Sequence, residues 1–568
     1  MSSACLPDGI RLESLEVGAT PLIRHFLRRL NLSALLTQHL PRLPGRQPEV
    51  DSGTVLGLLV TNLLLSRQPL YGIAGWAARR VPDYLGLLPE QIRHLNDDRI
   101  GRALDHLRRA DRASLLTALV IHAVNEFEVD LSELHQDTTT VTFSGNYDGQ
   151  APAEQAERPP RITFGYNKDH RPDLKQLVYG ITISADGAVP VHCKTYDGNT
   201  SDDRVHVETW TFLRKIIGHA DFLYVADSKL CTRVNMGFIA GHKGGRFLTV
   251  MPKTRGEDKW FRAHLRENAV QWREVHREAN PRGRDKPEVV YHAVESPQRS
   301  SEGYRVLWYR SSIKQEQDAQ QRQQRLERAR NTLVGPQAAP RRCFAGPQEA
   351  REAGERVLEQ EQVSDCLGVE VDCEIEETYQ QVGPGRPGPQ TVYQRIETSR
   401  YYIRFVEDAE ALKRAAMCDG LFPLMSNDEN LSLEEALGKY KYQPFVEKRH
   451  EQLKNGFAVT PMWLKNVGRV ESMLWLYYVV ELVQALLERE LRRQMEGARR
   501  ASLALYPEGR RSEAPTAALV FAALEGHRRH RLLDEHGQEL RRFHDSLSDT
   551  AQEVLDLLGV DQTPYGLN

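Results

Sequence analysis

Residues 131–143 read LSELHQDTTTVTF, and this stretch decides the fold. It is rich in β-branched residues, from Thr138 to Val141, which favour an extended strand. The same strand carries Asp137, and a carboxylate is costly to bury unless it is paired or bound to a metal ion. The stretch therefore predicts the start of a new domain and, within it, a candidate functional residue.

Two further strands are predicted directly after this one. They cover 176–184 and 189–196, and Asp186-Gly187 between them is a strong hairpin signal. Three neighbouring strands are therefore expected to form one side of a sheet.

A second aspartate follows a different kind of strand. Residues 222–226 form an unbroken apolar run that ends at Asp227, as is typical of a strand buried on both faces. A helix over 202–217, closed by Gly218, precedes it, and 246–251 supplies a fifth strand. The order of three strands, helix, strand, helix, strand predicts an α/β fold with a mixed sheet flanked by helices.

The regions around this core differ in character. From Pro21 to Phe127 apolar residues recur at helical spacing, and Asp51 is placed to cap one of these helices. After the fifth strand the pattern is interrupted by a charged helix over 314–332 and by a Pro/Gly linker beginning at Gly383.

Strand-like segments dominate the rest of the interruption, so we interpret it as an insertion. They cover 288–294, 304–309, 369–375, 392–396 and 400–406. We also expect the chain after the core to be helical, over 470–495 and 516–558.

Five domains are predicted on these grounds. They are a helical N-terminal domain for end binding or dimer contact (1–127), the first part of the core (128–255), a β-rich insertion with a helical arm (256–418), the second part of the core (419–495) and a helical C-terminal region (496–568).

Composition excludes several classes of protein. With 568 residues, 40% hydrophobic and 27% charged, the chain is expected to be a soluble multidomain protein without membrane spans. Its seven cysteines are scattered, which argues against zinc ribbons and disulfide frameworks and favours the reducing cytoplasm. A net charge of −3 gives no bulk attraction for nucleic acid, so any such partner must be recognised locally.

A third acidic residue, Glu447, lies on a short helix. Pro444 suits the first position of that helix, and Ser432 with Glu435 forms a capping box for the helix before it. Magnesium and manganese prefer oxygen ligands, and two ions roughly 4 Å apart can hold both oxygens of a phosphodiester exchange. Asp137, Asp227 and Glu447 are therefore candidate ligands, with Glu451 the strongest rival for Glu447.

The segment 440–454 carries a recognisable motif. It reads Tyr440, two residues, Gln443, three residues, Glu447, six residues, Lys454. This spacing resembles the Tyr-Arg-Glu-Lys motif of insertion-sequence DDE transposases. The segments 165–175 (GYNKDHRPDLK) and 197–202 (DGNTSD) also look like strand-flanking segments of that family.

The resemblance implies a fold, a reaction and partners. The core would be ribonuclease-H-like, with Asp137, Asp227 and Glu447 holding two Mg²⁺ or Mn²⁺ ions. The enzyme would cut DNA at the terminal inverted repeats of a mobile element and join the ends to target DNA. Because two ends must be held, a homodimer or larger assembly is expected in the DNA complex.

Six residues are predicted to contact DNA. The resemblance assigns phosphate contacts to Tyr440, Lys454 and Gln443, although Gln443 replaces the arginine of the family and lacks its charge. The loop before the second strand adds Lys168, His170 and Arg171, either as DNA contacts or as an ordinary solvated loop.

Two other functions stay open for this chain. It is either a nuclease of the same fold that cuts without joining, or a domesticated relative that only binds DNA. The arginines of the charged helix, Arg322, Arg325, Arg328 and Arg330, are either a solvated arm or further DNA contacts.

Overall fold

The strand at the centre of the sequence analysis is present as β2 (Glu133–Phe143), and nearly all of it is buried. It pairs antiparallel with β3 (Lys175–Ser184), which pairs antiparallel with β4 (Pro190–Asp197). On its other side β2 runs parallel to β5 (Leu223–Ala226), and β6 (Arg246–Val250) comes next, giving the order β4-β3-β2-β5-β6. The predicted mixed α/β sheet is confirmed for these strands.

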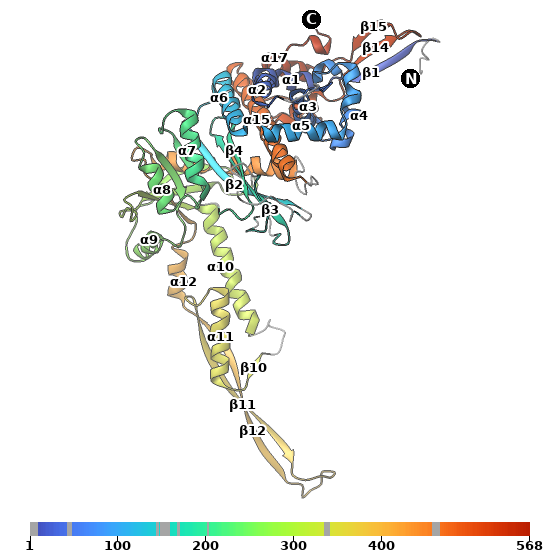
Figure 1. Cartoon of the computed structure of the whole chain (residues 1–568). Coiled ribbons are helices and arrows are strands. Elements are labelled where there is room, and N and C mark those ends of the chain that lie inside the picture. The colour runs from blue at the N-terminus through green and yellow to red at the C-terminus, as the bar shows by residue number, and fades with distance from the viewer. Residues whose placement is uncertain are drawn as a thin grey trace. The chain divides into compact units, whose positions relative to one another are not determined.

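Two compact units make up the chain in this computed structural model (Figure 1). The first unit combines Met1–Leu248 with Gly438–Asn568, and the second is Thr249–Leu437. The structure describes residues 9–42, 48–143, 147, 159–166, 168, 171–201, 204–283, 285–333, 341–456 and 466–567. The five predicted domains divide the chain more finely and stay predictions.

The N-terminal region of the first unit is largely helical, as predicted. Asp51 caps α3 by accepting a hydrogen bond from the backbone N–H of Thr54 at 3.0 Å. The helices of this region are α1 (Thr20–Arg29), α2 (Leu32–His39), α3 (Ser52–Leu65), α4 (Ile73–Ala78), α5 (Asp97–Arg109) and α6 (Arg112–Phe127). Helix α7 (Val205–Ile217) precedes β5, and α8 (Arg233–Ala240) follows it.

A long apolar helix, α15 (Val467–Gly497), forms the core of the first unit. It contacts α1, α3, α5 and β4. Its length and hydropathy would also suit a membrane span, but 94% of its apolar window is buried inside the protein. Burial against neighbouring elements accounts for its composition.

The C-terminal region is not wholly helical, and the prediction for 516–558 is wrong in its middle. Between α16 (Ala517–Leu524) and α17 (Asp549–Leu557) lie β14 (Arg528–Leu533) and β15 (Glu539–His544). Gly537, with φ of 76°, closes the turn between them. An N-terminal strand, β1 (Arg11–Glu16), pairs with β14, and such a partner from the opposite end of the chain leaves no local signal.

The second unit holds an antiparallel set of strands and an extended segment, residues 312–416, which we call the arm. The order is β13 (Leu421–Ser426), β9 (Arg305–Ser311), β8 (Val289–Glu295) and β7 (Arg273–Glu278). Helix α9 (Gly256–Glu267) covers β9, since the ring of Phe261 stacks on that of Trp308 at 4.3 Å between centroids.

The arm contains more helix than predicted. Helix α10 (Ser312–Leu333) is the expected charged helix, but α11 (Pro347–Glu361) and α12 (Ala409–Ala416) are additional. Strand β12 (Tyr393–Glu407) is one strand where two were predicted, and it pairs along its whole length with β11 (Leu367–Gln381). The ribbon of β11 and β12 extends beyond α11 (Figure 1).

The arm also has a small core of its own. It includes buried side chains from α10, α11 and both strands, such as Leu326, Leu358, Leu367 and Ile403. The short strand β10 (Cys343–Phe344) pairs with β12 at Tyr401 and Tyr402.

After β13 the chain continues into the first unit through two short helices. Helix α13 (Leu433–Tyr440) begins with the predicted capping box, in which Ser432 and Glu435 exchange hydrogen bonds at 2.9 and 3.1 Å. Helix α14 (Pro444–Glu451) begins at Pro444, as predicted, and packs against β2 and β3.

Candidate active site

Asp137 and Asp227 come from neighbouring parallel strands at corresponding positions. The register pairs Gln136 of β2 with Ala226, the last residue of β5; Asp137 is the next residue of β2, and Asp227 directly follows β5. Adjacent strands lie about 4.8 Å apart. The two aspartates therefore lie at neighbouring positions where β5 ends and β2 continues, although 90 positions of sequence numbering separate them.

The carboxylate of Asp137 is surrounded by basic groups. Its Oδ1 accepts a hydrogen bond from the backbone N–H of Thr138 at 2.7 Å and lies 3.6 Å from Nζ of Lys168. Its Oδ2 lies 3.7 Å from Nε2 of His450 on α14. Asp137 is only partly exposed, so these neighbours fix its position.

The carboxylate of Asp227 lies in a turn after β5. Its Oδ1 accepts a hydrogen bond from the backbone N–H of Lys229 at 3.0 Å. Burial raises the pKa of the Tyr440 hydroxyl, and the nearby carboxylates of Glu447 and Asp227 raise the pKa further. Tyr440 therefore lies near two of the three predicted acids.

Helix α14 is attached to β2 by the side chain of Gln443. Its Nε2 donates to the backbone carbonyl of Gln136 at 3.1 Å, and its Oε1 lies 3.2 Å from Nδ1 of His135. The amide nitrogen and the amide oxygen of Gln443 thus both have partners on β2, in the two residues that precede Asp137.

A chain of polar contacts continues from His135. Its Nε2 lies 2.9 Å from Glu133, which also accepts a hydrogen bond from Lys439 on α13. Burial alone would raise the pKa of Glu133, but the hydrogen bonds from His135 and Lys439 hold the pKa below its usual value. Glu133 is therefore a carboxylate, and this network ties both short helices to β2.

His450 is a feature that the sequence analysis missed. Burial, with added repulsion from Lys168 and Lys454, lowers the pKa of its imidazole to about 3, so the ring is neutral near pH 7. A signal existed, because His450 lies three residues after Glu447 and so shares its helix face. A lone histidine on a short helix is nevertheless too common to have been singled out.

The three predicted acids do not form a single ligand cluster. Across the described residues, no three His, Cys, Asp or Glu side chains lie close enough together to hold a metal ion. Glu447 is exposed on α14, whereas Asp137 and Asp227 are half-buried. The backbone register puts the two aspartates at neighbouring positions of β2 and the turn after β5, and the helix of Glu447 packs against β2.

The residues predicted to contact DNA have different surroundings. Lys168 donates to the backbone carbonyl of Thr138 at 2.5 Å, and Arg171 makes a bidentate ion pair with Asp173 at 2.8 and 2.7 Å. His170 lies outside the described residues. Gln443 is buried. DNA contact stays a prediction for all six residues, and Gln443 in this structure contacts protein.

The arginines of α10 are engaged within the second unit. Arg322 makes a bidentate ion pair with Asp419 at 2.5 and 2.7 Å, and Arg328 pairs with Glu361 at 2.9 Å. Arg330 pairs with Glu407. These ion pairs connect α10 to α11, to β12 and to the loop before β13.

Comparisons with known proteins give limited matches. Residues 12–121 match a family described as a domain of unknown function (DUF4277). No curated protein matches the chain. A structure of the piggyBac transposase synaptic complex with hairpin DNA aligns with a TM-score of 0.26 and 10% identity, covering 52% of this chain and 62% of that chain. The chain thus spans less than two thirds of that transposase, and the family match falls on the N-terminal helices, outside the strands that carry Asp137 and Asp227.

Proposed function

We propose that this chain is a DDE transposase, which cuts DNA at the ends of an insertion sequence and joins the ends to target DNA. The observation that carries the proposal is that Asp137 and Asp227 each directly follow the last paired residues, Gln136 and Ala226, of two adjacent parallel strands. The packing of α14, with Glu447, against β2 supports it. So does the resemblance of segment 440–454 to the transposase motif.

The donor set suits Mg²⁺ or Mn²⁺. Two half-buried carboxylates, one in β2 and one directly after β5, offer oxygen ligands, and the exposed side chain of Glu447 can rotate toward them. Asp137, Asp227 and Glu447 would hold two ions, which would supply charge neutralisation and activation of the attacking oxygen.

The surrounding residues have separate tasks in this proposal. Lys168 and Lys454 place positive charge beside Asp137, where the phosphate of the cut strand would lie. The hydroxyl of Tyr440, whose pKa is raised, stays protonated and can donate a hydrogen bond to a phosphate oxygen. Gln443 acts on the site through the position of α14.

The proposed partners follow from the reaction. They are the terminal inverted repeats of the element and the target DNA, and holding two ends together requires at least a dimer. The proposed location is the cytoplasm, without membrane attachment.

Cleavage and joining by the purified full-length protein test the proposal. Duplexes carrying the DNA that flanks this reading frame are incubated with Mg²⁺, and nicked and joined products are separated on denaturing gels. We expect both products from the native chain. Asp137→Asn, Asp227→Asn and Glu447→Gln are each expected to abolish both, because each removes a charged ligand while keeping side-chain size.

Glu451→Gln is the matched control on the same helix. It removes a charge four residues from Glu447 and is expected to keep full activity. Loss of activity in Glu451→Gln but not in Glu447→Gln would overturn the assignment of the third acid. Nicked products without joined ones would indicate a nuclease, and DNA binding without cutting would indicate a domesticated relative.

A further inference from the structure

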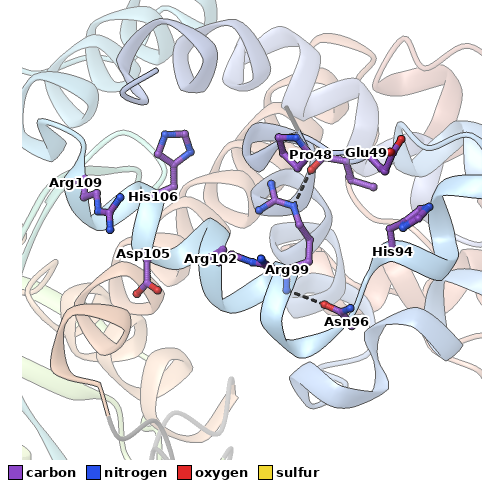
Figure 2. A pocket seen from close by; sticks show the side chains of 10 residues that line it. Pro48, Glu49, His94, Asn96, Arg99, Arg102, Asp105, His106 and Arg109 are labelled. Carbon is purple, nitrogen blue, oxygen red and sulfur yellow. Dashed lines mark hydrogen bonds between the residues drawn. The ribbon is translucent and has the colours of Figure 1, made fainter. Parts of the chain in front are cut away.

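A cavity of about 470 Å³ lies beside α5 in the first unit (Figure 2). It falls within the N-terminal helices that match the domain of unknown function, and none of the proposed active-site residues lines it. Its wall is formed by α5 on one side and by residues 48–50 and 94–96 on the other.

Four basic residues of α5 line this cavity. They are Arg99, Arg102, His106 and Arg109, and their spacings of three, four and three residues place them on one face of the helix. Figure 2 shows them following one another along α5. The whole basic face of the helix is thus turned toward the cavity.

Two of the four basic residues fix the wall. Arg99 donates to the backbone carbonyl of Val50 at 2.7 Å and to Oγ of Ser52 at 2.9 Å. His106 contacts the backbone carbonyl of Pro41 through Nε2. These contacts hold α5 in place and give the cavity a defined shape.

The other two basic residues, Arg102 and Arg109, have N–H groups that can bind a ligand. Arg102 donates through Nε to the Asp98 carbonyl at 3.1 Å, and Arg109 is near Asp105, whose pKa is lowered by the hydrogen bond from Arg469 and also by the charge of Arg109. Both arginines are exposed at the mouth of the cavity. Of the two acidic residues on the wall, Asp105 is neutralised by Arg469 in a bidentate pair at 2.9 and 2.7 Å, and the other is Glu49. Positive charge therefore prevails along the α5 side.

The buried side of the cavity holds an unsatisfied polar atom. His106 is 7% exposed, and its Nδ1 has no hydrogen-bond partner among the residues that the structure describes. Buried polar atoms in folded proteins nearly always have such a partner. Because the Pro41 carbonyl can only accept, Nε2 of His106 carries its proton and Nδ1 is placed to accept a hydrogen bond, for example from a water molecule. The two guanidinium groups are therefore the features that indicate a negatively charged ligand.

We propose that this cavity binds a phosphate group through Arg102 and Arg109, with His106 fixing the wall beside them. Guanidinium groups match phosphate with paired N–H···O hydrogen bonds, and the cavity is large enough to admit one backbone phosphate and its sugar. The proposed function supplies the source, a phosphodiester of bound DNA, and this part of the inference rests on that function. The site would fix DNA on the N-terminal helices, apart from the reaction.

The salt dependence of DNA binding tests the inference in the full-length protein. The dissociation constant for a fluorescently labelled duplex is measured by anisotropy at several NaCl concentrations. Each phosphate contact contributes about 0.9 to the slope of log Kd against log salt. The double variant Arg102→Gln/Arg109→Gln is expected to bind more weakly and to lose about 0.9 from that slope.

The matched control is the double variant Arg79→Gln/Arg541→Gln. It removes the same charge from exposed positions of the same unit, outside the cavity. Its slope is expected to stay at the native value. Equal slopes and affinities for both double variants would overturn the inference, and circular dichroism verifies that each variant is folded.

Inorganic phosphate separates the site from the proposed function. It is expected to raise the melting temperature of the native protein more than that of Arg102→Gln/Arg109→Gln. If the native protein binds no duplex but keeps this difference, the phosphate site stands with another source of phosphate, and the proposed function fails. If phosphate stabilises the native and double-variant proteins equally, the site is overturned, whatever the duplex result.

Discussion

Gln443 joins two segments that are far apart in sequence, and its amide is suited to that task. The carbonyl of Gln136 can only accept a hydrogen bond, so Nε2 of Gln443 must face it and Oε1 must face His135. An amide satisfies both partners at once. The substitution of glutamine for the arginine of the motif is therefore consistent with a positioning role beside Asp137.

Gln443→Ala tests this positioning role. The variant leaves the Gln136 carbonyl and Nδ1 of His135 buried without their partner, which costs about 1–3 kcal/mol for each group. We expect a lower melting temperature together with slower strand cleavage, because α14 loses its attachment to β2.

Gln324→Ala is the control for this variant, since Gln324 is exposed on α10. It is expected to change neither quantity. Retention of native cleavage rates by Gln443→Ala at temperatures where the variant is folded would contradict the role.

Glu481 gives stability a pH dependence of its own. It is buried on α15, and burial raises the pKa of its carboxyl from a usual value of 4.5 to about 8. Between these values the folded chain keeps a proton that the unfolded chain releases. Stability should therefore fall as pH rises through this window, by up to about 1.4 kcal/mol per pH unit.

Glu481→Gln removes this dependence, because an amide is neutral at every pH. We expect melting temperatures of variant and native protein to be similar at pH 5 and the variant to be the more stable at pH 8. Glu496→Gln, at an exposed position of the same helix, should show no such trend. A constant difference across pH would refute the assignment.

Individual residues of the site were predictable to different degrees. Asp137 and Asp227 could be identified because each lies in or directly after a strand-like apolar run. The contacts of Gln443 with His135 and Gln136 could not be predicted, because more than 300 residues separate them and no periodicity connects them. Such contacts depend on tertiary packing alone.

Helix α11 approaches β11 closely at Gly354. A Cβ atom added there would lie 2.7 and 2.9 Å from the two methyl carbons of Val369. The helix and the strand can come this close only because position 354 lacks a side chain. Gly354 thus sets the spacing between the two elements inside the core of the arm.

Gly354→Ala is expected to destabilise the second unit by about 1–3 kcal/mol, although alanine favours helix. Gly237→Ala in α8 is the control, since an added Cβ there meets nothing within 4 Å. It should raise stability by up to about 1 kcal/mol. Chemical denaturation measures both, and a stabilising Gly354→Ala would contradict the close approach.

Elements with a strong local pattern were predicted well. Strands β2 to β5 carry apolar or β-branched runs, and the turn at Gly187 requires its positive φ of 81°. By contrast, β11 and β12 are exposed along most of their length and carry cross-strand ion pairs, such as Arg400 with Glu376. Because neither face of this ribbon is buried over that length, much of its sequence lacks the alternation of apolar and polar residues that marks a strand. The predicted strands were therefore shorter than the observed ones.

At the scale of the whole molecule, the two compact units predict unfolding in more than one step. Scanning calorimetry should resolve a transition for each unit. Gly354→Ala should lower only the transition of the second unit, and Gln443→Ala only that of the first. A single transition displaced equally by both variants would show that the units unfold together.

The chain order of the first unit also sets when its chemistry becomes possible. Asp137 and Asp227 precede the whole second unit, and Glu447 follows it. A ribosome adds about 5–20 residues per second, so the last acid is made roughly tens of seconds after the second. Helix α15, which packs against α5 and supplies Arg469 as the partner of Asp105 on the wall of the α5 cavity, is made later still. Under the proposed function, neither DNA binding at this cavity nor cleavage would begin before the segments that follow the second unit have been made.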